Sequence, residues 1–486
     1  MKINEMRELQ HCPINLKAKS WFPALVSIVG EENLVTDFSD RLAYGRDRWP
    51  FATMRYRFGH LPGYLPLVVV MPGSVEEIQA VLRLMNDARQ TVIAYGAGSG
   101  VLGGAAPMTP DVVMIDTKRL NSVLAVDEVS KLVTVQGGMN GERLEAHMNN
   151  LRYTVGHLPQ SLNMSTVAGW AACRGAGQAS GKYGKIEDIV AGMKVVLPNG
   201  DLVEIRPAPR RAVGPGLMEL FMGSEGTFGI IVELTMRFWD YPKKEILRTI
   251  GFKDYVSGLE ALRRIMQLGL KPPVTRLYDA PESEPRVKDY PDFKDHPCLC
   301  MLMFQGDPDI VALEDKKAME IVYECGGKLC CDEPSHSWLK HRFLPLSANP
   351  VSQGKLMDTC EVSAHWSIMP DVYENMRRAV LAVNPDAHVG AHWSHSYIDG
   401  ACLYMSFVVP GMDEEKAAEE HGKIWEGLTR GAQSAGGCMS HHHGVGYIRG
   451  KWMAQEWGKT GINILQQIKN VMDPNHIMNP GKIGLR

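Results

Sequence analysis

Hydrophobic and polar positions in the first quarter of the chain change from a strand period to a helix period and back. The apolar run at 67–71 predicts a buried strand, and a segment with helical spacing follows it. Ser74 and Glu77 stand at the spacing of a capping box, which marks the start of this helix. A second apolar run at 91–94 predicts another strand. The pattern therefore predicts a strand–helix–strand unit that leads into a glycine-rich loop at 95–108.

The remaining periodic segments predict two halves that are built differently. Up to residue 240, the expected elements are strands at 112–116, 131–138 and 230–239, a helix at 141–153 and a hairpin at 193–205. After it, the expected elements are strands at 298–306 and 401–410 and helices near 309–326, 371–382, 413–430 and 461–474. Residues 1–40 are expected to form a helical lead-in. The length of 486 residues also favours two domains.

Composition and charge narrow the classes of function. A hydrophobic content of 45% and a charged content of 22% describe an ordinary soluble globular protein. The formal net charge of −3 provides no general attraction for nucleic acid or for an anionic membrane. No apolar run is long enough to span a membrane, and residues 1–12 lack the apolar region of a signal peptide. We therefore expect a cytoplasmic protein that binds no nucleic acid and has no transmembrane segment.

The cysteines favour neither a disulfide scaffold nor a metal centre. Ten cysteines in a chain of this length are too few for a disulfide scaffold and suit a reducing compartment. The spacing CxxC does not recur, so neither a zinc ribbon nor an iron–sulfur motif is present. We expect no bound metal.

The glycine-rich loop YGAGSGVLGGAAPM at 95–108 has two interpretations. Five glycines among nine residues allow positive φ angles and leave few side chains to keep a ligand away. Such a loop can direct several backbone N–H groups at a pyrophosphate. The alternative is an ordinary glycine-rich turn. The loop lacks the pattern GxGxxG, which disfavours an NAD site of the Rossmann kind.

Further motifs along the chain give this loop a context. They are GHLPQSLNMSTVAGW at 156–170, YGKIED at 183–188, MGSEGT at 222–227, SHHHGVG at 440–446 and NVMDPNHIMNPGKIG at 470–484. In order and spacing, the loop and these motifs resemble the flavin-binding domain of the vanillyl-alcohol oxidase superfamily. Within that superfamily the chain resembles the alkyldihydroxyacetonephosphate synthase family, which shares the forms YGxIED, MGSEGT and SHHHGVG.

The resemblance implies an α+β fold with bound FAD. A PCMH-type (p-cresol methylhydroxylase-type) FAD-binding domain of two α/β subdomains is expected at 1–240, an α+β cap domain that covers the substrate at 241–435, and a return to the FAD-binding domain at 436–486. Some relatives link the flavin to a histidine or cysteine of the glycine loop, but neither residue occurs in this loop, so FAD is expected to be non-covalent. The residues that the resemblance assigns to FAD binding are Gly96, Ala97, Gly98, Ser99, Gly100, Val101, Gly103, Pro159, Ser161, Thr166, Gly169, Trp170, Ala172, Gly181, Gly184, Glu225, Gly229 and Ile231.

Three adjacent histidines, His441, His442 and His443, are candidates for proton transfer. On an extended strand their side chains would alternate, with His441 and His443 on one face. A zinc site is one interpretation, but adjacent histidines would not all point at one metal, and no neighbouring carboxylate or cysteine completes a ligand set. A purely structural run is another. We favour proton transfer because the pKa of imidazole lies near neutrality.

The resemblance adds four candidate catalytic residues. Tyr404 could act as an acid or base if its pKa is lowered, and the alternative is an aromatic residue packed in the cap. His157 matches a family histidine, although the acidic residues that flank it in the family are absent here. Arg276 and Arg342 could clamp a carboxylate or phosphate of the substrate, and the alternative is that they lie on the surface.

The expected function is that of an FAD-linked oxidase or dehydrogenase. The superfamily implies hydride transfer to flavin N5 from an alcohol, a phenol or a 2-hydroxy acid. The alternative is the non-redox synthase reaction of ether-lipid synthesis, and a third possibility, a flavin-free scaffold, is disfavoured by the intact glycine loop. The expected partners are a small-molecule substrate, oxygen or an electron-acceptor protein, and further copies of the chain in a homo-oligomer.

Overall fold

The computed structural model of the chain describes residues 16–57, 60, 62–344, 355–411 and 413–486. The expected helical lead-in therefore lies partly outside the described residues. Its described part contains the helices α2 (Phe22–Val29) and α3 (Phe38–Ala43), and α4 (Pro50–Arg57) comes next. No helix among the described residues is both long enough and apolar enough to cross a membrane.

The first sheet has four strands and contains the predicted strand–helix–strand unit. Its order is β1 (Leu34–Val35), β2 (Val68–Val70), β4 (Val112–Asp116) and β3 (Thr91–Tyr95), and β2, β4 and β3 run parallel. Helix α5 (Val75–Asp87) connects β2 to β3. Its N-cap Ser74 accepts the N–H of Glu77 at 3.1 Å, so the predicted helix start is confirmed. The three parallel strands are rich in β-branched residues and buried, as strands covered on both faces require.

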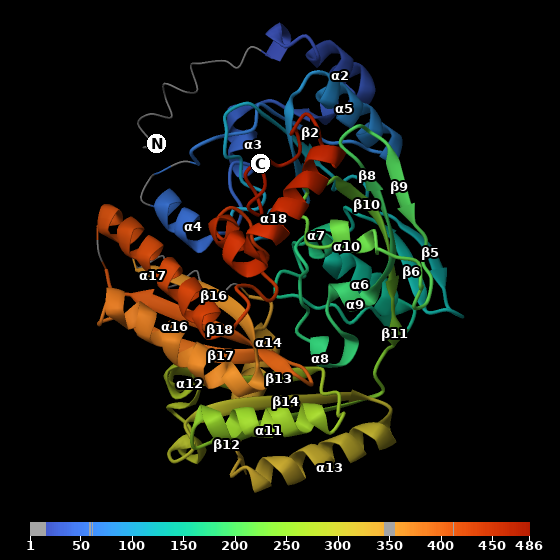
Figure 1. Cartoon of the computed structure of the whole chain (residues 1–486). Coiled ribbons are helices and arrows are strands. Elements are labelled where there is room, and N and C mark those ends of the chain that lie inside the picture. Colours follow the sequence, from blue (N-terminus) through green and yellow to red (C-terminus); the bar gives the residue numbers. More distant parts are fainter. Residues whose placement is uncertain (1–15, 58–59, 61, 345–354, 412) are drawn as a thin grey trace.

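The second sheet is a five-stranded antiparallel sheet with short helices on one face. Its order is β5 (Val123–Asp127), β6 (Leu132–Gln136), β10 (Ile230–Arg237), β8 (Val190–Val196) and β9 (Leu202–Ile205). The helices that share its core are α6 (Gly141–Asn150), α7 (Val167–Ala172), α9 (Ile186–Ile189) and α10 (Met218–Phe221). Short strands β7 (Tyr153–Thr154) and β11 (Trp239–Asp240) pair below it, near α8 (Ser180–Tyr183) (Figure 1).

The third sheet has seven strands, and all its pairings are antiparallel. Its order is β15 (Lys328–Leu329), β12 (Lys244–Phe252), β14 (Cys298–Gly306), β13 (Val274–Tyr278), β17 (His388–Ser396), β18 (Gly400–Val409) and β16 (Leu356–His365). The helices of this half are α11 (Tyr255–Gln267), α12 (Ala280–Val287), α13 (Pro308–Glu324), α14 (Glu333–His341), α16 (Met369–Val383) and α17 (Glu414–Ser434). Side chains of α11, α13, α16 and α17 form its main apolar core with one face of the sheet.

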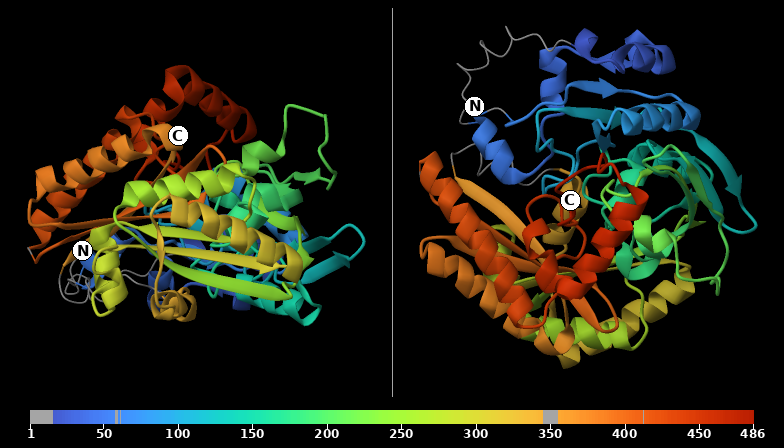
Figure 2. Two further views of the ribbon diagram at one scale, coloured as in Figure 1. Left: turned by 90° about the horizontal axis from the view of Figure 1, so that it is seen from below. Right: turned by 45° about the horizontal axis from the view of Figure 1, so that its top comes forward.

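The end of the chain returns to the first half. Helix α18 (Met453–Met472), drawn in red in Figures 1 and 2, lies between the five-stranded and seven-stranded sheets. Its residues Ile462 and Leu465 pack against the cores of both. Beyond α18, Met478 forms a bridge with Val92 of β3. This bridge places the end of the chain against the first sheet, and the division into domains, including the C-terminal return, stays a prediction.

Candidate active site

The glycine loop after β3 has an irregular backbone with a run of free donors. The N–H groups from Ala97 to Leu102 donate no hydrogen bond to any described residue. Gly98 and Gly103 have φ angles of 59° and 75°, which favour glycine. Free N–H groups in series are what an oxygen-rich anion such as a pyrophosphate requires. The loop therefore fits the phosphate groups of a dinucleotide better than it fits a self-contained turn.

Helix α7 and the residues before it border this loop. A Cβ atom on Gly96 would lie 2.3 Å from Oγ1 of Thr166, the N-cap of α7. This hydroxyl is buried and has no hydrogen-bond partner among the described residues, as expected for a group that contacts a bound ligand. Four of the residues predicted to bind FAD belong to α7 or its N-cap, and two lie in the preceding turn: Thr166, Gly169, Trp170, Ala172, Pro159 and Ser161.

Other residues predicted to bind FAD have contacts within the protein. A Cβ atom on Gly181 would lie 2.2 Å from the carbonyl oxygen of Pro272, and one on Gly184 2.5 Å from Cβ of Asp188. A Cβ atom on Gly229 would lie 2.6 Å from the carbonyl oxygen of Val196. These three positions are thus crowded by protein atoms. Close packing alone explains why each is a glycine.

Two further predicted residues, Glu225 and Ile231, also interact with the protein itself. The Glu225 carboxylate accepts the N–H of Val445 at 2.6 Å and that of Gly446 at 2.9 Å. Ile231 is buried in the core of the five-stranded sheet. Glu225 therefore joins the motif MGSEGT to the segment that follows the three histidines.

A row of polar side chains crosses four strands of the seven-stranded sheet. Glu361 of β16 lies opposite Tyr404 of β18, Tyr404 lies opposite His392 of β17, and His392 lies opposite Tyr278 of β13. Their strand neighbours Val362, Leu403, Trp393 and Leu277 belong to the apolar core with the helices. Because side chains alternate along a strand, the row lies on the face opposite that core.

Tyr404 occupies the middle of this row. Its hydroxyl lies 3.0 Å from Oγ1 of Thr359, and its ring stacks on that of His392 with 4.7 Å between centroids. Burial raises the pKa of Tyr404 above its ordinary value. The condition for a role as an acid or base, a lowered pKa, is therefore not met, and the phenol keeps its proton at neutral pH.

His441, His442 and His443 lie in a bend, here called the histidine turn, and not on an extended strand that would alternate their side chains. The buried Glu361 carboxylate explains this backbone, because it accepts the N–H groups of His441 at 2.7 Å and His443 at 2.6 Å. Glu361 in turn pairs with the buried guanidinium of Arg449 at 3.0 Å. One carboxylate thus accepts hydrogen bonds from neighbouring backbone N–H groups. On an extended strand, consecutive N–H groups would point in opposite directions.

The imidazole rings form a hydrogen-bonded cluster. His441 Nε2 lies 2.8 Å from the Tyr397 hydroxyl, and His441 Nδ1 lies 2.9 Å from His442 Nδ1. His395 joins this cluster from β17, with Nδ1 2.7 Å from Oγ of Ser180. Burial lowers the pKa of His395, His441 and His442 well below the ordinary value. The rings are therefore neutral at pH 7.

The same cluster bears on metal binding. One ligand atom from each of His395, His441 and His442 lies within 4.8 Å of the others. Two of the three adjacent histidines thus face a common point with the distant His395, and His443 is not part of this group. The absence of a bound metal stays a prediction, and the pair His441–His442 already uses one nitrogen of each ring for its mutual hydrogen bond.

His157 lies apart from the three adjacent histidines but near His395. It is buried, and neither ring nitrogen has a hydrogen-bond partner among the described residues. Its ring packs against Trp170 with 4.6 Å between centroids. Burial, aided by the charge of Lys185, lowers the pKa of His157 to about 3. It is thus a neutral ring with two unused nitrogen atoms.

Arg276 and Arg342 both lie near the indole of Trp338, with guanidinium carbons 5.5 and 5.7 Å from its ring centroid. Arg276 also donates to His392 Nε2 at 2.8 Å. Because that nitrogen must accept, His392 carries its hydrogen on Nδ1, 2.8 Å from the Glu282 carboxylate. Neither arginine has a carboxylate within 4.0 Å among the described residues. Within the described residues, both cations thus lie near the same indole, and the nearest carboxylate effect on Arg342 comes from Glu245, which lies beyond ion-pair distance.

The sequence prediction missed several residues of this site. They are Glu282, Glu361, His392, His395, Tyr397 and Lys185. Two signals were available, namely acidic residues inside otherwise apolar strand sequences and the spacing HWSH at 392–395. A register shift between Trp393 and His395 changes the alternation of β17, which strand periodicity cannot reveal.

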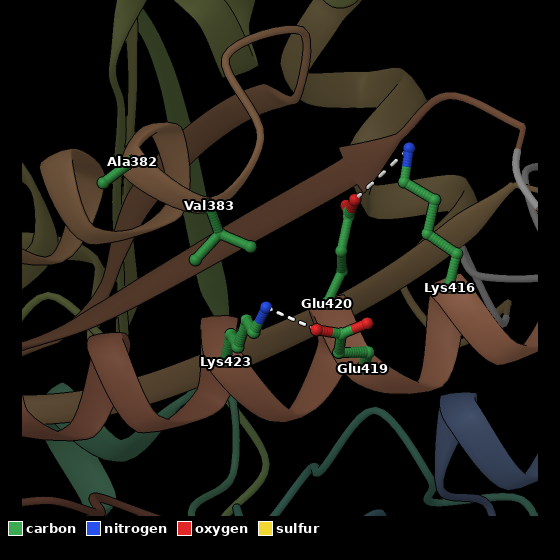
Figure 3. A pocket seen from close by; sticks show the side chains of 6 residues that line it. All are labelled: Ala382, Val383, Lys416, Glu419, Glu420 and Lys423. Atoms are coloured by element: carbon green, nitrogen blue, oxygen red, sulfur yellow. Dashed lines mark hydrogen bonds and ion pairs between the residues drawn. The ribbon is translucent and has the colours of Figure 1, made fainter.

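A surface hollow of about 360 Å³ lies between α16 and α17 (Figure 3). Ala382 and Val383 line one side, and the ion pairs Lys416–Glu420 and Lys423–Glu419 line the other. None of the predicted site residues lines this hollow. Its charged groups are paired with one another, so it offers no free group for chemistry.

Comparison with known families agrees with the two halves of the chain. Residues 66–206 match the FAD binding domain family, and residues 241–483 match the C-terminal domain of FAD linked oxidases. An uncharacterized FAD-linked oxidoreductase, YgcU of Escherichia coli (strain K12), is 30% identical over 94% of this chain and 97% of its own length.

Two further relatives carry different activities in their names. Alkyldihydroxyacetonephosphate synthase of Dictyostelium discoideum is 28% identical, and the match covers 88% of this chain and 75% of the synthase. D-lactate dehydrogenase of Anaerostipes hadrus is 27% identical, and the match covers 86% of this chain and 89% of the dehydrogenase. The relatives thus include both a redox enzyme and a synthase.

Solved structures support the PCMH-type fold. A structure of alkyldihydroxyacetonephosphate synthase superimposes with a TM-score of 0.79 at 24% identity over 95% of this chain and 84% of the synthase chain. A substrate complex of p-cresol methylhydroxylase superimposes with a TM-score of 0.77 at 18% identity, covering 96% of this chain and 98% of the other. At these identities the likeness concerns the fold alone.

Proposed function

Since the chain belongs to the FAD-linked oxidase family, we propose that it is an FAD-dependent oxidoreductase that oxidises a small anionic alcohol, with 2-hydroxy acids as the first candidates. The observation that carries this proposal is the pair of arginines beside the polar row. Their charges have no carboxylate partner among the described residues, whereas a 2-hydroxy acid supplies one next to the hydroxyl to be oxidised. A neutral phenol or alcohol would form no ion pair with either arginine.

FAD fits the first half of the chain. The free N–H groups at 97–102 would hold its pyrophosphate, and the unpartnered hydroxyl of Thr166 provides a further polar contact. Crowding by protein atoms at Gly181, Gly184 and Gly229 makes these residues weaker candidates for cofactor contact. When bound, FAD supplies the hydride acceptor for the oxidation of the substrate carbon.

The histidine cluster would accept the proton that leaves the substrate hydroxyl. His442 and His443 are neutral at pH 7 because burial lowers the pKa of each, and a neutral imidazole has one nitrogen that can accept. This role requires that His442 Nδ1 carries the hydrogen and donates it to His441 Nδ1, which leaves Nε2 of His442 as the accepting atom. A positioned general base of this kind accelerates a reaction by about 10²- to 10⁴-fold.

Tyr404 would act as a hydrogen-bond donor and not as a base. Its pKa is raised by burial, and its ring lies 5.3 Å from that of His443 and 6.0 Å from that of His442. A protonated phenol beside neutral imidazoles can hold a substrate oxygen while a histidine removes its hydrogen. Arg276, fixed by His392 and Tyr278, would orient the anionic end of the substrate.

The test is to mix the purified, flavin-loaded protein with candidate substrates without oxygen and to record flavin absorbance. We expect bleaching by a 2-hydroxy acid and none by the matching alcohol that lacks the carboxylate. Arg276→Gln should weaken the response to the acid. Bleaching by phenols or neutral alcohols at equal rates would contradict an anionic substrate. Re-oxidation by oxygen, compared with re-oxidation by an artificial acceptor dye, would identify the class of electron acceptor.

The synthase reaction is the second candidate. The shared form SHHHGVG at 440–446 favours it, as does the 28% identical synthase relative. In that case the flavin would stay oxidised with every hydroxy acid, and the protein would release a fatty acid from an acylated, phosphorylated substrate in the presence of a fatty alcohol. The two candidates therefore give opposite results in the same absorbance experiment.

A further inference from the structure

The C-terminal motif Asn479–Gly484 packs against the glycine loop. Lys482 is fully buried, and its Nζ donates to the carbonyl oxygen of Gly103 and, at 2.9 Å, to that of Ala106. Asn479 Nδ2 donates to the carbonyl oxygen of Gly104 at 3.2 Å. Three carbonyl groups of the loop are thus held by the last eight residues of a chain of 486.

A residue from the N-terminal part of the chain holds the same loop from the other side. Asp47 Oδ2 accepts the N–H of Gly103 at 2.6 Å, and the neighbouring Arg48 N–H donates to the carbonyl oxygen of Gly100 at 2.8 Å. Asp47 is buried, with 4% of its surface exposed. Gly103 is therefore fixed at both its N–H and its C=O group, at a φ angle of 75°.

Three ionisable groups meet behind the loop, none of which belongs to the histidine cluster. Burial lowers the pKa of Lys482 to about 8, although Asp47 and Glu225 act in the opposite direction. Burial raises the pKa of Asp47 to about 6 and also raises that of Glu225. The hydrogen bonds of this buried ammonium go to backbone carbonyl groups, and burying a charge in this way costs free energy.

We propose that Asp47 and Lys482 form a latch that keeps the glycine loop in its FAD-binding shape. Both are positioning residues that act through Gly103, and the latch makes cofactor retention depend on residues near both ends of the chain. The physical reason is preorganisation: an untied loop must lose backbone entropy when its free N–H groups converge on the pyrophosphate. The inference rests on the FAD cofactor and not on any substrate.

The test measures how fast the flavin-loaded protein releases FAD after dilution, followed by the rise in flavin fluorescence. Lys482→Met should release FAD roughly tenfold faster or more, the factor expected for hydrogen bonds from a charged group. Lys469→Met is the matched control, because Lys469 is also buried in the C-terminal segment but donates to Thr227, Met478 and Asp473. Equal release rates for the two variants, or a wild-type rate for Lys482→Met, would overturn the latch.

Asp47 provides a second, independent pair of variants if Lys482→Met does not fold. Asp47→Asn keeps an acceptor for the Gly103 N–H and should release FAD within about threefold of the wild-type rate, whereas Asp47→Ala should release it roughly tenfold faster. Equal acceleration in both variants would mean that the carboxylate charge matters and the hydrogen bond does not, which contradicts the proposal. Because no substrate is added, failure of the proposed reaction would leave these results unaffected.

Discussion

The glycine loop and the histidine-bearing face of the seven-stranded sheet organise polar groups in different ways. The loop presents backbone N–H groups from six consecutive residues. The sheet face presents side chains from four strands and from the histidine turn. The first arrangement depends on local backbone geometry, and the second depends on strand register. Each can therefore be damaged without the other, except at the few residues that connect them.

Replacing a histidine of the cluster should give the largest effect. We expect a change in the rate of flavin reduction and no change in FAD binding. We expect His442→Ala to lower the rate of flavin reduction by about 10²- to 10⁴-fold, because a general base is lost. FAD should stay bound, since the glycine loop is untouched. Stopped-flow absorbance with the identified substrate measures the rate, and His365→Ala, on an exposed histidine, is the control. Loss of flavin from His442→Ala would mean that the two regions are not separate.

Glu361→Gln should show how much the sheet face depends on one buried ion pair. The variant leaves the fully buried Arg449 without its counter-ion, which costs about 3–5 kcal/mol of unfolding free energy. Urea unfolding measures this loss. Glu419→Gln removes one partner of an exposed pair with Lys423 and should change the stability far less, because water already solvates both charges. Similar costs for the two variants would contradict the role of Glu361 as the anchor of the histidine turn.

Gly98→Val should damage the loop and spare the sheet face. A Cβ atom on Gly98 would lie 2.4 Å from the Tyr95 hydroxyl, and a φ of 59° costs a β-branched residue about 1–3 kcal/mol. The dissociation constant for FAD should rise roughly tenfold or more, while the rate of the flavin-saturated enzyme stays near that of the wild type. Gly422→Val, at a site where nothing lies within 4 Å, should bind FAD normally.

His157→Phe is expected to act only through a pH dependence of stability. The pKa of His157 is lowered to about 3 in the folded protein, so between that value and about 6.5 the unfolded chain binds one more proton. Wild-type stability should therefore fall with decreasing pH by about 1.4 kcal/mol per unit from this residue. The variant should gain about 2 kcal/mol relative to the wild type between pH 7 and 5 in urea unfolding. No relative gain would mean that His157 finds a partner for its charged form.

Local pattern was enough to predict most of the elements. The strand at 112–116 and the helix start at Ser74 agree with the structure, and the helix expected near 413–430 runs over Glu414–Ser434. These features depend on periodicity and capping within a few residues. The glycine loop belongs to the same class, because glycine content alone indicates where positive φ angles are allowed.

The sheet face could be predicted only in part. Tyr404 and the three histidines were found because short motifs carry them, but Glu361 and His392 complete the row only through pairing with β18. His395 reaches the cluster past the register shift in β17. The backbone of the histidine turn is set by the Glu361 carboxylate, 80 residues earlier in the chain, which no local pattern contains. Roles for all of these residues stay predictions.

The row from Glu361 to Tyr278 has a consequence for how the enzyme gains activity as it folds. More than a hundred residues separate Tyr278 of β13 from His392 of β17, and they form β14 and several helices. Loops of this length close slowly, and pairings between distant segments dominate the folding time. After dilution from denaturant, helical content should therefore recover before catalytic turnover. The delay between the recovery of helical content and the recovery of turnover would measure how long the pairing of β13 with β17 takes.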